Sequence, residues 1–530
     1  MLRARTCWRE CCCCIAKARR PLLQHQTRFF ASLAPETWTR PTIFAPATGK
    51  GKSAIAILRI SGDDALQVWR RMTVSPRSRK RLKEDPPERR AVLRKIVHPE
   101  TDEVLDEGVV LYFPPHSALT AQPTLELHLH GSSALMQLLL KLLPTLSPSF
   151  RIAEPGEFTR LAFEAGKMDL TEVEGIRDLV EADTEAQRKL AARQANGQMR
   201  QAYDAMRANA IEATALIEAL IDFGEDEGIS EGVYEQESLM KPSAARDKVV
   251  SLRDRIQGYL DDGRRGEIIR SGIHLAIVGP PNAGKSSLLN WLARREAAIV
   301  TEIPGTTRDV LELSLDFHGY PIVIADTAGL RETKDRVETI GIARAVERAA
   351  TADLKLCVLS LDQLFSGAST SRPVVDPLTL SLIDSHTLIL LNKTDSVSPT
   401  PAQLDALRST LRSEGKRWYG SEAERPFWLV SVKKASGLQE LADGLKEQVK
   451  ESFELSDNLD ETPIVTQERH RRHLEDCLAS LSSFLEIPSN DIVDAGEELR
   501  YAIRSLGQIT GAVDVEEVLG EIFAGFCIGK

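Results

Sequence analysis

The stretch Gly279-Pro-Pro-Asn-Ala-Gly-Lys-Ser286 decides how the rest of this chain is interpreted. It matches the pattern G-x-x-x-x-G-K-[ST] at every fixed position, between an apolar run at 274–278 and a helix-forming run at 287–293. Such a turn between a strand and a helix directs several backbone N–H groups at phosphates. We therefore predict a P-loop in which Lys285 reaches the β- and γ-phosphates and Ser286 binds Mg²⁺.

Three further elements follow in the chain order expected of a GTPase domain. The apolar run 321–325 ends in Asp326-Thr-Ala-Gly329, which would hold the Mg²⁺ shell and sense the γ-phosphate. Residues 386–391 end in Asn392-Lys-Thr-Asp395, and the Asp395 carboxylate can accept from guanine N1–H and N2–H₂, which adenine lacks. Residues 427–430 lead to Ser431-Val-Lys433, similar to the S-A-K loop that supports guanine. The predicted nucleotide contacts are Asn282, Ala283, Gly284, Lys285, Ser286, Ser287, Thr301, Thr306, Thr307, Asp326, Thr327, Ala328, Gly329, Asn392, Lys393, Asp395, Ser431, Val432 and Lys433.

The hydrolytic machinery differs from that of small GTPases such as Ras. The position after Gly329, where Ras has a water-orienting Gln, is Leu330, which has no polar side-chain atom. Two groups could take over the roles of the Ras Gln and of an arginine finger. Glu338 can orient the water, unless it is simply a solvent-facing helix residue, and a monovalent cation near Asn282 can replace the missing arginine finger. Lys285 and Glu338 are the predicted catalytic residues, and Thr307 is predicted to complete the Mg²⁺ shell.

The composition divides the remaining chain into several domains. The 530 residues carry a net charge of −10, which excludes a generally basic nucleic-acid coat, and no window is apolar enough for stable membrane insertion. Residues 1–40 are rich in Arg and poor in acids, as in a mitochondrial targeting presequence, although a disordered tail or a palmitoylated run of Cys11–Cys14 are alternatives. Residues 41–153 alternate short apolar runs and predict an α/β domain. Helical periodicity at 154–268 and 451–530 predicts two halves of one bundle, with a GTPase domain inserted at 269–450.

Several stretches together identify a family that this chain resembles. They include residues 279–287 (GPPNAGKSS), 302–309 (EIPGTTRD), 326–332 (DTAGLRE), 154–170 and the terminal FCIGK at 526–530. They resemble the MnmE/TrmE tRNA-modification GTPase family, mitochondrial branch, over about residues 42–530. The resemblance implies a multi-domain α/β and α fold with an N-terminal α/β folate-binding domain, a helical-bundle domain and an inserted P-loop GTPase domain.

The resemblance also implies ligands and partners. It implies a homodimer in the mitochondrial matrix that binds GTP, Mg²⁺ and a 5-formyl or methylene tetrahydrofolate, and hydrolyses GTP faster with K⁺. The implied K⁺ contacts are Asn282, Thr301, Ile303 and Thr306, with Glu338 orienting the water; the implied folate contacts are Arg59, Glu126, Lys167 and Lys530. An FAD-containing MnmG/GidA-type partner and mitochondrial tRNA follow, with a carboxymethylaminomethyl or taurinomethyl group built on carbon 5 of the wobble uridine.

Other interpretations compete with parts of this prediction. A ribosome-assembly GTPase would carry an RNA-binding module such as a KH loop, and none is recognisable after the GTPase domain. A dynamin-like membrane remodeller would need a lipid-binding segment, and the acidic chain disfavours it. Cys527 is either a reactive thiol or a buried structural residue. His128 and His130 could suggest a metal site, but no third ligand is recognisable nearby. Arg469–His473 is the first candidate for tRNA phosphates and Arg77–Lys83 the second, although either run alone is more often solvated surface.

Overall fold

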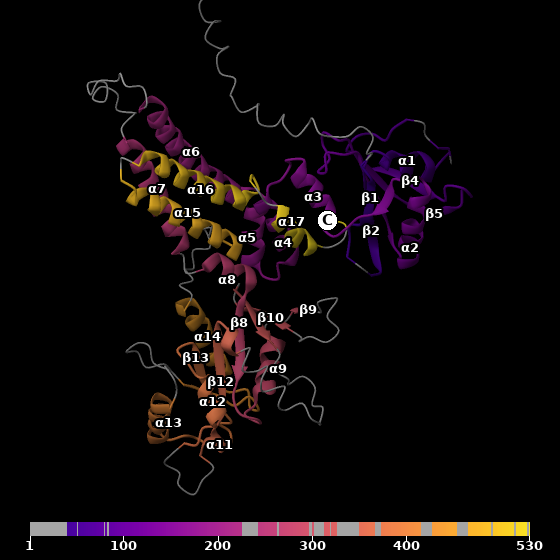
Figure 1. The fold of residues 1–530 in the computed structure, drawn as a ribbon. Helices are drawn as coiled ribbons and strands as arrows, with labels where there is room; N and C mark the ends of the chain where they lie inside the picture. Colours follow the sequence, from indigo (N-terminus) through magenta and orange to yellow (C-terminus); the bar gives the residue numbers. More distant parts are fainter. Residues whose placement is uncertain are drawn as a thin grey trace, which may run out of the picture. The chain divides into compact units, whose positions relative to one another are not determined.

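A computed structural model describes most of the chain as two compact units. The described residues are 40–49, 51–78, 80–81, 84–224, 242–261, 264–295, 299–301, 312–317, 320–325, 349–365, 373–414, 427–452, 465–488, 491–513, 516–526 and 529. The first unit comprises residues 1–162 with 527–530, and the second comprises 163–526 (Figure 1). The first unit thus extends beyond the predicted domain end at residue 153 and includes the C-terminal residues.

The first unit is built on a mixed sheet with helices on its faces. Its described strands are β1 Thr42–Pro46, β2 Ser53–Ser61, β3 Thr73–Val74, β4 Val92–Val97, β5 Val104–Phe113, β6 Thr124–Gly131 and β7 Phe150–Ile152, in the order β3-β4-β5-β6-β2-β1-β7. Its helices are α1 Ala65–Met72, α2 Ser133–Leu142, a 3-10 turn Leu143–Thr145 and α3 Glu157–Glu164. The sequence predicts a loop over 77–94, but Val92, Leu93 and Arg94 belong to β4 instead, because they pair with β5.

Side chains alternate between the two faces of this sheet, as strand geometry requires. One face carries Leu58 and Ile60 of β2 and Leu125 and Leu127 of β6, which are buried with Trp69 of α1. The opposite face carries a smaller apolar cluster in which Phe158 of α3 packs with Ile43 and Ala45. Arg59 lies between Leu58 and Ile60 on β2, and Glu126 lies between Leu125 and Leu127 on β6. Arg59 and Glu126 therefore belong to this second face.

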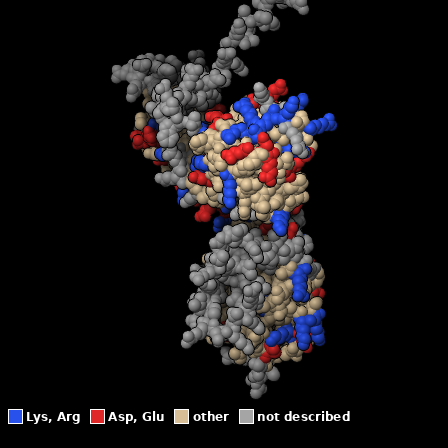
Figure 2. Space-filling view, turned by 90° about the vertical axis from the view of Figure 1, so that its right-hand side faces the viewer, with Lys and Arg blue, Asp and Glu red and all other residues tan. Residues whose placement is uncertain are grey.

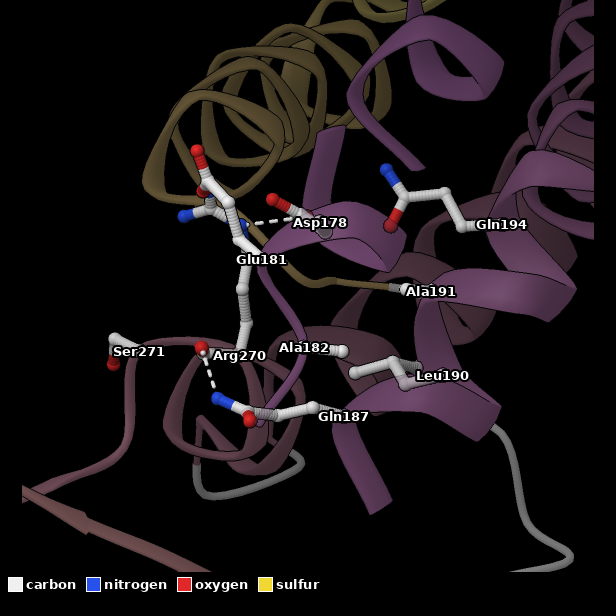
Figure 3. A pocket seen from close by; sticks show the side chains of 9 residues that line it. All are labelled: Asp178, Glu181, Ala182, Gln187, Leu190, Ala191, Gln194, Arg270 and Ser271. Carbon is white, nitrogen blue, oxygen red and sulfur yellow. Dashed lines mark hydrogen bonds and ion pairs between the residues drawn. The ribbon is translucent and has the colours of Figure 1, made fainter. Parts of the chain in front are cut away.

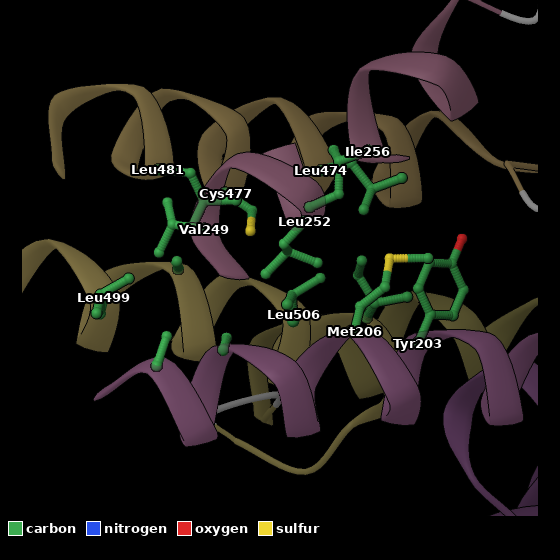
Figure 4. Packing of buried hydrophobic residues seen from close by; sticks show 14 of the residues in the cluster. Tyr203, Met206, Val249, Leu252, Ile256, Leu474, Cys477, Leu481, Leu499 and Leu506 are labelled. Carbon is green, nitrogen blue, oxygen red and sulfur yellow. The ribbon is translucent and has the colours of Figure 1, made fainter. Parts of the chain in front are cut away.

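The second unit contains a helical bundle whose two halves are far apart in the sequence. Its helices are α4 Leu170–Glu181, α5 Glu185–Ala195, α6 Gln198–Gly224, α7 Pro242–Leu260, α15 Glu468–Glu486, α16 Ile492–Thr510 and α17 Glu516–Ala524. Tyr203, Leu252 and Ile256 from the first half pack against Leu474 and Leu506 from the second (Figure 4). One apolar core therefore joins both halves, which confirms the predicted bundle with an inserted domain.

The helix boundaries follow from local sequence signals. Asp169 and Glu172 form a reciprocal capping box at the start of α4, and Thr184 and Gln187 do the same for α5. The sequence predicts one helical stretch over 184–223, but the structure divides it into α5 and α6. The chain turns at Gly197, which has φ 78°, a conformation that favours glycine.

The inserted segment forms a second, mostly parallel sheet. Its strands are β8 Ile273–Val278, β9 Ile299–Thr301, β10 Glu312–Phe317, β11 Tyr320–Ala325, β12 Leu354–Ser360, β13 Thr387–Asn392 and β14 Trp428–Leu429, in the order β14-β13-β12-β8-β11-β10-β9. Its helices are α9 Lys285–Arg295, α11 Leu361–Leu364, α12 Pro377–Leu382, α13 Pro401–Glu414 and α14 Leu438–Ser452, and α8 Arg265–Ser271 leads into β8. Apolar clusters cover both faces of the sheet, as expected for an α/β domain. Among the described residues, no helix has the length and apolarity needed to cross a bilayer.

Candidate functional site

The P-loop lies between β8 and α9, as predicted. Gly279 has φ 138°, and a Cβ there would lie 2.2 Å from the Val358 carbonyl oxygen, so the loop leaves β8 pressed against β12. The chain then adopts positive φ at Asn282 (62°) and at Gly284 (102°) before α9 begins at Lys285. These conformations curl the backbone into the tight loop that a phosphate requires.

Lys285 lies across this loop. Its Nζ donates to the carbonyl oxygens of Gly279 and Pro280, each at 2.8 Å. Burial lowers the pKa of Lys285, because a desolvated ammonium group is disfavoured. The ammonium group is therefore fixed at the loop, where a bound phosphate would offer it a stronger acceptor than a carbonyl.

Asn392 joins three of the predicted motifs. Its side-chain Nδ2 donates to the Ala283 carbonyl oxygen at 2.8 Å, and its Oδ1 accepts from the backbone N–H of Val432 at 3.2 Å. A Cβ at Gly284 would lie 2.2 Å from Asn392 Nδ2, so only glycine fits there. The P-loop, the N-K-x-D element and the Ser431 loop therefore meet at the carboxyl ends of β8, β13 and β14, where ligands bind in open α/β sheets.

The Asp395 carboxylate, which is predicted to bind guanine, is stabilised in its ionised form. Ser431 Oγ donates to Asp395 Oδ1 at 2.6 Å and accepts from the backbone N–H of Lys434 at 3.2 Å. The Ser431 hydrogen bond is the main cause that lowers the pKa of Asp395. The carboxylate therefore stays ionised and keeps its other oxygen available as an acceptor.

One residue of this site escaped the sequence analysis. Asp362, at the start of α11, pairs with Lys393 Nζ at 2.9 Å and accepts a hydrogen bond from Ser360. Lys393 has φ 69°, so the pair supports an unusual backbone conformation within the N-K-x-D element. No motif marks Asp362, because its role depends on β12 lying parallel to β13.

Some predicted residues lie outside the described part of the chain. These are Ile303, Thr306, Thr307, Asp326, Thr327, Ala328, Gly329, Glu338, Cys527 and Lys530. The backbone of Thr301 ends β9 and pairs with Glu312 of β10. The Mg²⁺ shell, the cation site and the water-orienting role of Glu338 therefore stay predictions.

A second polar site lies on the first unit's sheet. Arg59 of β2 and Glu126 of β6 are directly opposite each other, with Arg59 Nε 2.9 Å from Glu126 Oε1. Arg59 Nη1 also donates to the Gly529 carbonyl oxygen at 3.4 Å. Gly529 has φ 101°, and a Cβ there would lie 2.0 Å from the Pro46 carbonyl oxygen. The C-terminal glycine thus packs beside two of the predicted folate contacts.

Two histidines near this site, His128 and His130, contact acidic side chains. His128 Nε2 lies 3.4 Å from Glu126, whereas His130 Nδ1 lies 2.7 Å from Asp106. These two histidines therefore contact different carboxylates. Lys167, a further predicted folate contact, belongs to the second unit.

The structure contradicts the prediction that the run Arg469–His473 as a whole is available to RNA phosphates, because only Arg472 of the run is exposed. Arg469 donates to Glu174 at 2.9 Å and to the Gln508 and Ile509 carbonyl oxygens, and its side chain is only 14% exposed. His470 is fully buried, with Nε2 2.8 Å from Glu174. Arg469 and His470 can face the bundle interior because Glu174 on α4 provides the compensating charge.

A cavity of about 200 Å³ lies where α8 meets α4 and α5 (Figure 3). Arg270 Nε pairs with Asp178 at 2.7 Å, and the Arg270 carbonyl oxygen accepts from Gln187 Nε2 at 3.0 Å. None of the predicted nucleotide or folate contacts lines it.

The two described cysteines, Cys357 and Cys477, are buried. Burial raises the pKa of each thiol to about 12 and makes them poor nucleophiles.

Comparison with known proteins places the chain in a family. A family model described as the MnmE helical domain matches residues 170–527, and one described as the GTP-binding protein TrmE N-terminus matches residues 42–167. A tRNA modification GTPase MnmE of Paramagnetospirillum magneticum is 42% identical over 490 residues, covering 92% of this chain and 99% of the relative. A mitochondrial 5-taurinomethyluridine-tRNA synthase subunit of Danio rerio is 40% identical over 525 residues, covering 98% and 99%.

A further relative and a solved structure match different extents of the chain. A mitochondrial tRNA modification GTPase of Dictyostelium discoideum is 38% identical over 502 residues, covering 93% of this chain and 95% of the relative. Among solved structures, the G domain of the T. maritima FeoB iron transporter is 22% identical, covers 33% of this chain and 98% of its own, and has a TM-score of 0.22. Because the helical model alone matches more than half of the residues and the relatives match nearly end to end, this chain belongs to the MnmE/TrmE family of GTP-binding proteins.

Proposed function

We propose that this chain is the GTP-hydrolysing subunit of a mitochondrial complex that modifies carbon 5 of the wobble uridine in tRNA. The observation that carries the proposal is the hydrogen-bonded joining of the P-loop, Asn392 and the Asp395–Ser431 pair. This arrangement supplies a phosphate cradle and an ionised acceptor for guanine in one place. The names of the relatives, as tRNA modification GTPases and as a subunit of a tRNA synthase, supply the substrate class.

The mechanism assigns most of the catalysis to positioning and electrostatics. Lys285 neutralises charge that develops on the β–γ bridging oxygen, and Ser286, the second residue of α9, would hold Mg²⁺. Glu338 orients the attacking water in place of the absent Gln. Asn282 and the backbone of 301–306 would hold a K⁺ ion, which would supply positive charge in place of an arginine finger. Asn282 supports this role because its φ of 62° places it at the turn of the loop beside the phosphate position.

The folate proposal rests on the first unit. A reduced folate carries carboxylates at one end and a pterin edge with N–H donors at the other. Glu126 suits the pterin N–H donors, and Arg59, 2.9 Å from Glu126, would meet the same end of the ligand. Both lie on the sheet face opposite the main core. The Gly529 backbone lies against Pro46 at the end of β1 and against Arg59, whereas its sequence neighbour Lys530 lies outside the described residues. A homodimer and an FAD-containing MnmG/GidA-type partner complete the proposed complex.

Guanine reading is tested by exchanging one atom of the reader. Asp395→Asn removes an acceptor and adds a donor, so we expect GTP affinity to fall at least about 100-fold while xanthosine triphosphate binds better. The matched control is Asp405→Asn, an exposed residue of the same domain, with unchanged GTP affinity. Equal GTP affinity in both variants would contradict the assignment of the base site.

Hydrolysis is tested by the cation and by Glu338. We expect GTP turnover to be faster in KCl than in NaCl at equal ionic strength, and equal rates would remove the cation proposal. Glu338→Ala should slow turnover while leaving GTP affinity nearly intact. A large loss of affinity would make Glu338 a structural residue.

Folate and tRNA are tested separately. Equilibrium dialysis with labelled 5-formyltetrahydrofolate should show binding that Arg59→Gln weakens. The control Arg70→Gln, at an exposed residue of the same unit, should leave this binding unchanged.

Mass spectrometry of mitochondrial tRNA from cells lacking the protein should show wobble uridines without their carbon-5 group. Modification levels equal to wild type, with stalled ribosomal subunits instead, would favour the ribosome-assembly alternative.

A further inference from the structure

The outer edge of the first unit's sheet gathers basic side chains. β3 is the outermost strand and is two residues long, so it pairs only with Lys95 and Ile96 of β4. The chain after β3 turns back on itself, with Ser75 N–H donating to the Lys80 carbonyl oxygen at 3.1 Å. The start of β4 and the residues just before it therefore lie at the edge of the sheet beside this turn.

The charges at this edge are unevenly balanced. Residues 70–95 contain eleven Lys and Arg against three Asp and Glu. Three of the cations have acidic partners, because Arg70 pairs with Asp85 at 2.7 Å, Arg81 pairs with Asp102 and Lys95 pairs with Glu107 at 3.9 Å. Arg71 is exposed, but its guanidinium donates to the Leu146 carbonyl oxygen at 2.8 Å. Four others are exposed and have no acidic partner among the residues that the structure describes, namely Arg77, Lys80, Arg89 and Arg90. We call these four residues with Arg94 the basic edge.

Arg94 gives the basic edge a fixed element. It lies on β4, and its guanidinium stacks on the Trp69 ring, 4.7 Å from the centroid. Trp69 is itself fixed from the other side, since its Nε1 donates to the Glu84 carbonyl oxygen at 2.9 Å. Stacking orders the guanidinium without neutralising it. Figure 2 shows Lys and Arg side chains gathered on one side of this unit.

We propose that the basic edge binds the phosphate backbone of the RNA substrate. This inference rests on the proposed function, because it names where the tRNA contacts the chain. A protein of net charge −10 repels RNA in general and therefore needs a local basic surface to bind it. Four of the five residues are Arg, whose planar fork suits phosphate oxygens.

Two competing roles for these cations predict different behaviour. Cations at a sheet edge also prevent edge-to-edge pairing with another molecule, in which case their removal causes self-association. An acidic protein partner would likewise be attracted to this surface. Neither role predicts a preference for RNA over another polyanion.

The test compares two double variants of equal charge in the full chain. Arg89→Gln/Arg90→Gln removes two cations of the basic edge, and Lys52→Gln/Lys141→Gln removes two exposed cations that lie elsewhere in the same unit. Binding of an unmodified mitochondrial tRNA transcript is measured by fluorescence anisotropy over a series of salt concentrations. GTP turnover and light scattering report that each variant is folded and unassociated. Arg77→Gln/Lys80→Gln, on the neighbouring turn, is the second variant if the first is poorly folded.

We expect the basic-edge variant to bind tRNA about tenfold more weakly at physiological salt, and its salt slope to fall by about 1.5. The control should change affinity less than about twofold. Equal effects of both variants, no effect of either, or no tRNA binding by the wild type would overturn the inference. So would polyglutamate binding as tight as tRNA binding, or self-association of both basic-edge variants. The wobble-nucleoside measurement judges the proposed function independently of these results.

Discussion

Two arginine-rich runs of this chain have opposite surroundings. Arg469–His473 on α15 is turned into the helical bundle, where Glu174 of α4 and two carbonyl oxygens receive the Arg469 guanidinium. Arg77–Arg94 surrounds the outer edge of the first unit's sheet, and its cations are mostly exposed. Both runs have the composition of an anion-binding surface, but in the first only Arg472 is exposed, whereas most described cations of the second are exposed.

The difference shows that the elements packed against a run of charged residues decide whether its side chains are buried or exposed. α15 is buried on the face that carries His470, Leu474 and Cys477, and Arg469 and Arg471 flank that face at helical spacing. Glu174 and Glu267 approach from other helices and make the burial tolerable. A two-residue edge strand offers the second run no such cover. Substitutions in the two regions can break or sharpen this contrast, beginning with the largest expected effect.

Removing the buried anion should be the most damaging change. Glu174→Ala leaves Arg469 and His470 desolvated without a counter-charge, so the free energy of unfolding should fall by about 3–5 kcal/mol. Urea unfolding followed by far-UV circular dichroism measures this. The control Glu185→Ala breaks the exposed pair with Arg188 and should leave the curve unchanged. Similar curves for both variants would mean that burial does not distinguish the two kinds of pair.

The buried run should also make stability depend on pH. Burial lowers the pKa of His473 from 6.5 to about 4. The unfolded chain therefore takes up a proton that the folded chain refuses, and stability is lost as pH falls from 6.5 toward 4. Between pH 7 and pH 5 we expect a loss of about 1.5 kcal/mol that His473→Gln abolishes. An unchanged pH dependence in the variant would contradict this assignment.

The N-cap of α4 should act in the opposite direction. Burial raises the pKa of Asp169 from 3.8 to about 6. The folded chain therefore binds a proton more readily than the unfolded chain, and this group adds stability as pH falls from 6 toward 3.8. Asp169→Asn keeps an oxygen to cap α4 and should abolish a gain of about 1 kcal/mol between pH 7 and pH 5. Melting temperatures at both pH values measure the effect, and an enlarged gain in the variant would contradict it.

The smallest effect belongs to an exposed ion pair between Arg70 of α1 and Asp85 of the second run. Arg70→Gln breaks a pair whose side chains are 51% and 52% exposed, so stability should change by less than about 1 kcal/mol. High salt should reduce even this difference, whereas it should leave the effect of Glu174→Ala in place. A salt-insensitive loss of several kcal/mol would show that the edge is held together as the bundle is.

Much of the nucleotide site follows from the sequence, since its motifs are contiguous. Residues 274–293 specify a strand, a turn and a helix, and positive φ at Gly279 and Gly284 agrees with the glycines found there. The role of Asp362 does not follow, because its partner Lys393 lies 31 residues further along the chain. The division of 184–223 at Gly197 was also missed, because helical periodicity continues on both sides of the break.

The sequence alone determined the phosphate loop, the guanine-reading element and the apolar stripes of the bundle, because each depends on residues close together in the chain. Tertiary structure decided that Arg469 is buried and Arg89 exposed, that Asn392 ties three loops together, and that Gly529 meets Arg59. Those outcomes depend on side chains separated by 40 to 470 residues, since Glu174, Val432 and Arg59 are brought to their partners only by packing. Desolvation makes such pairing obligatory once the chain has folded, and no local pattern records it.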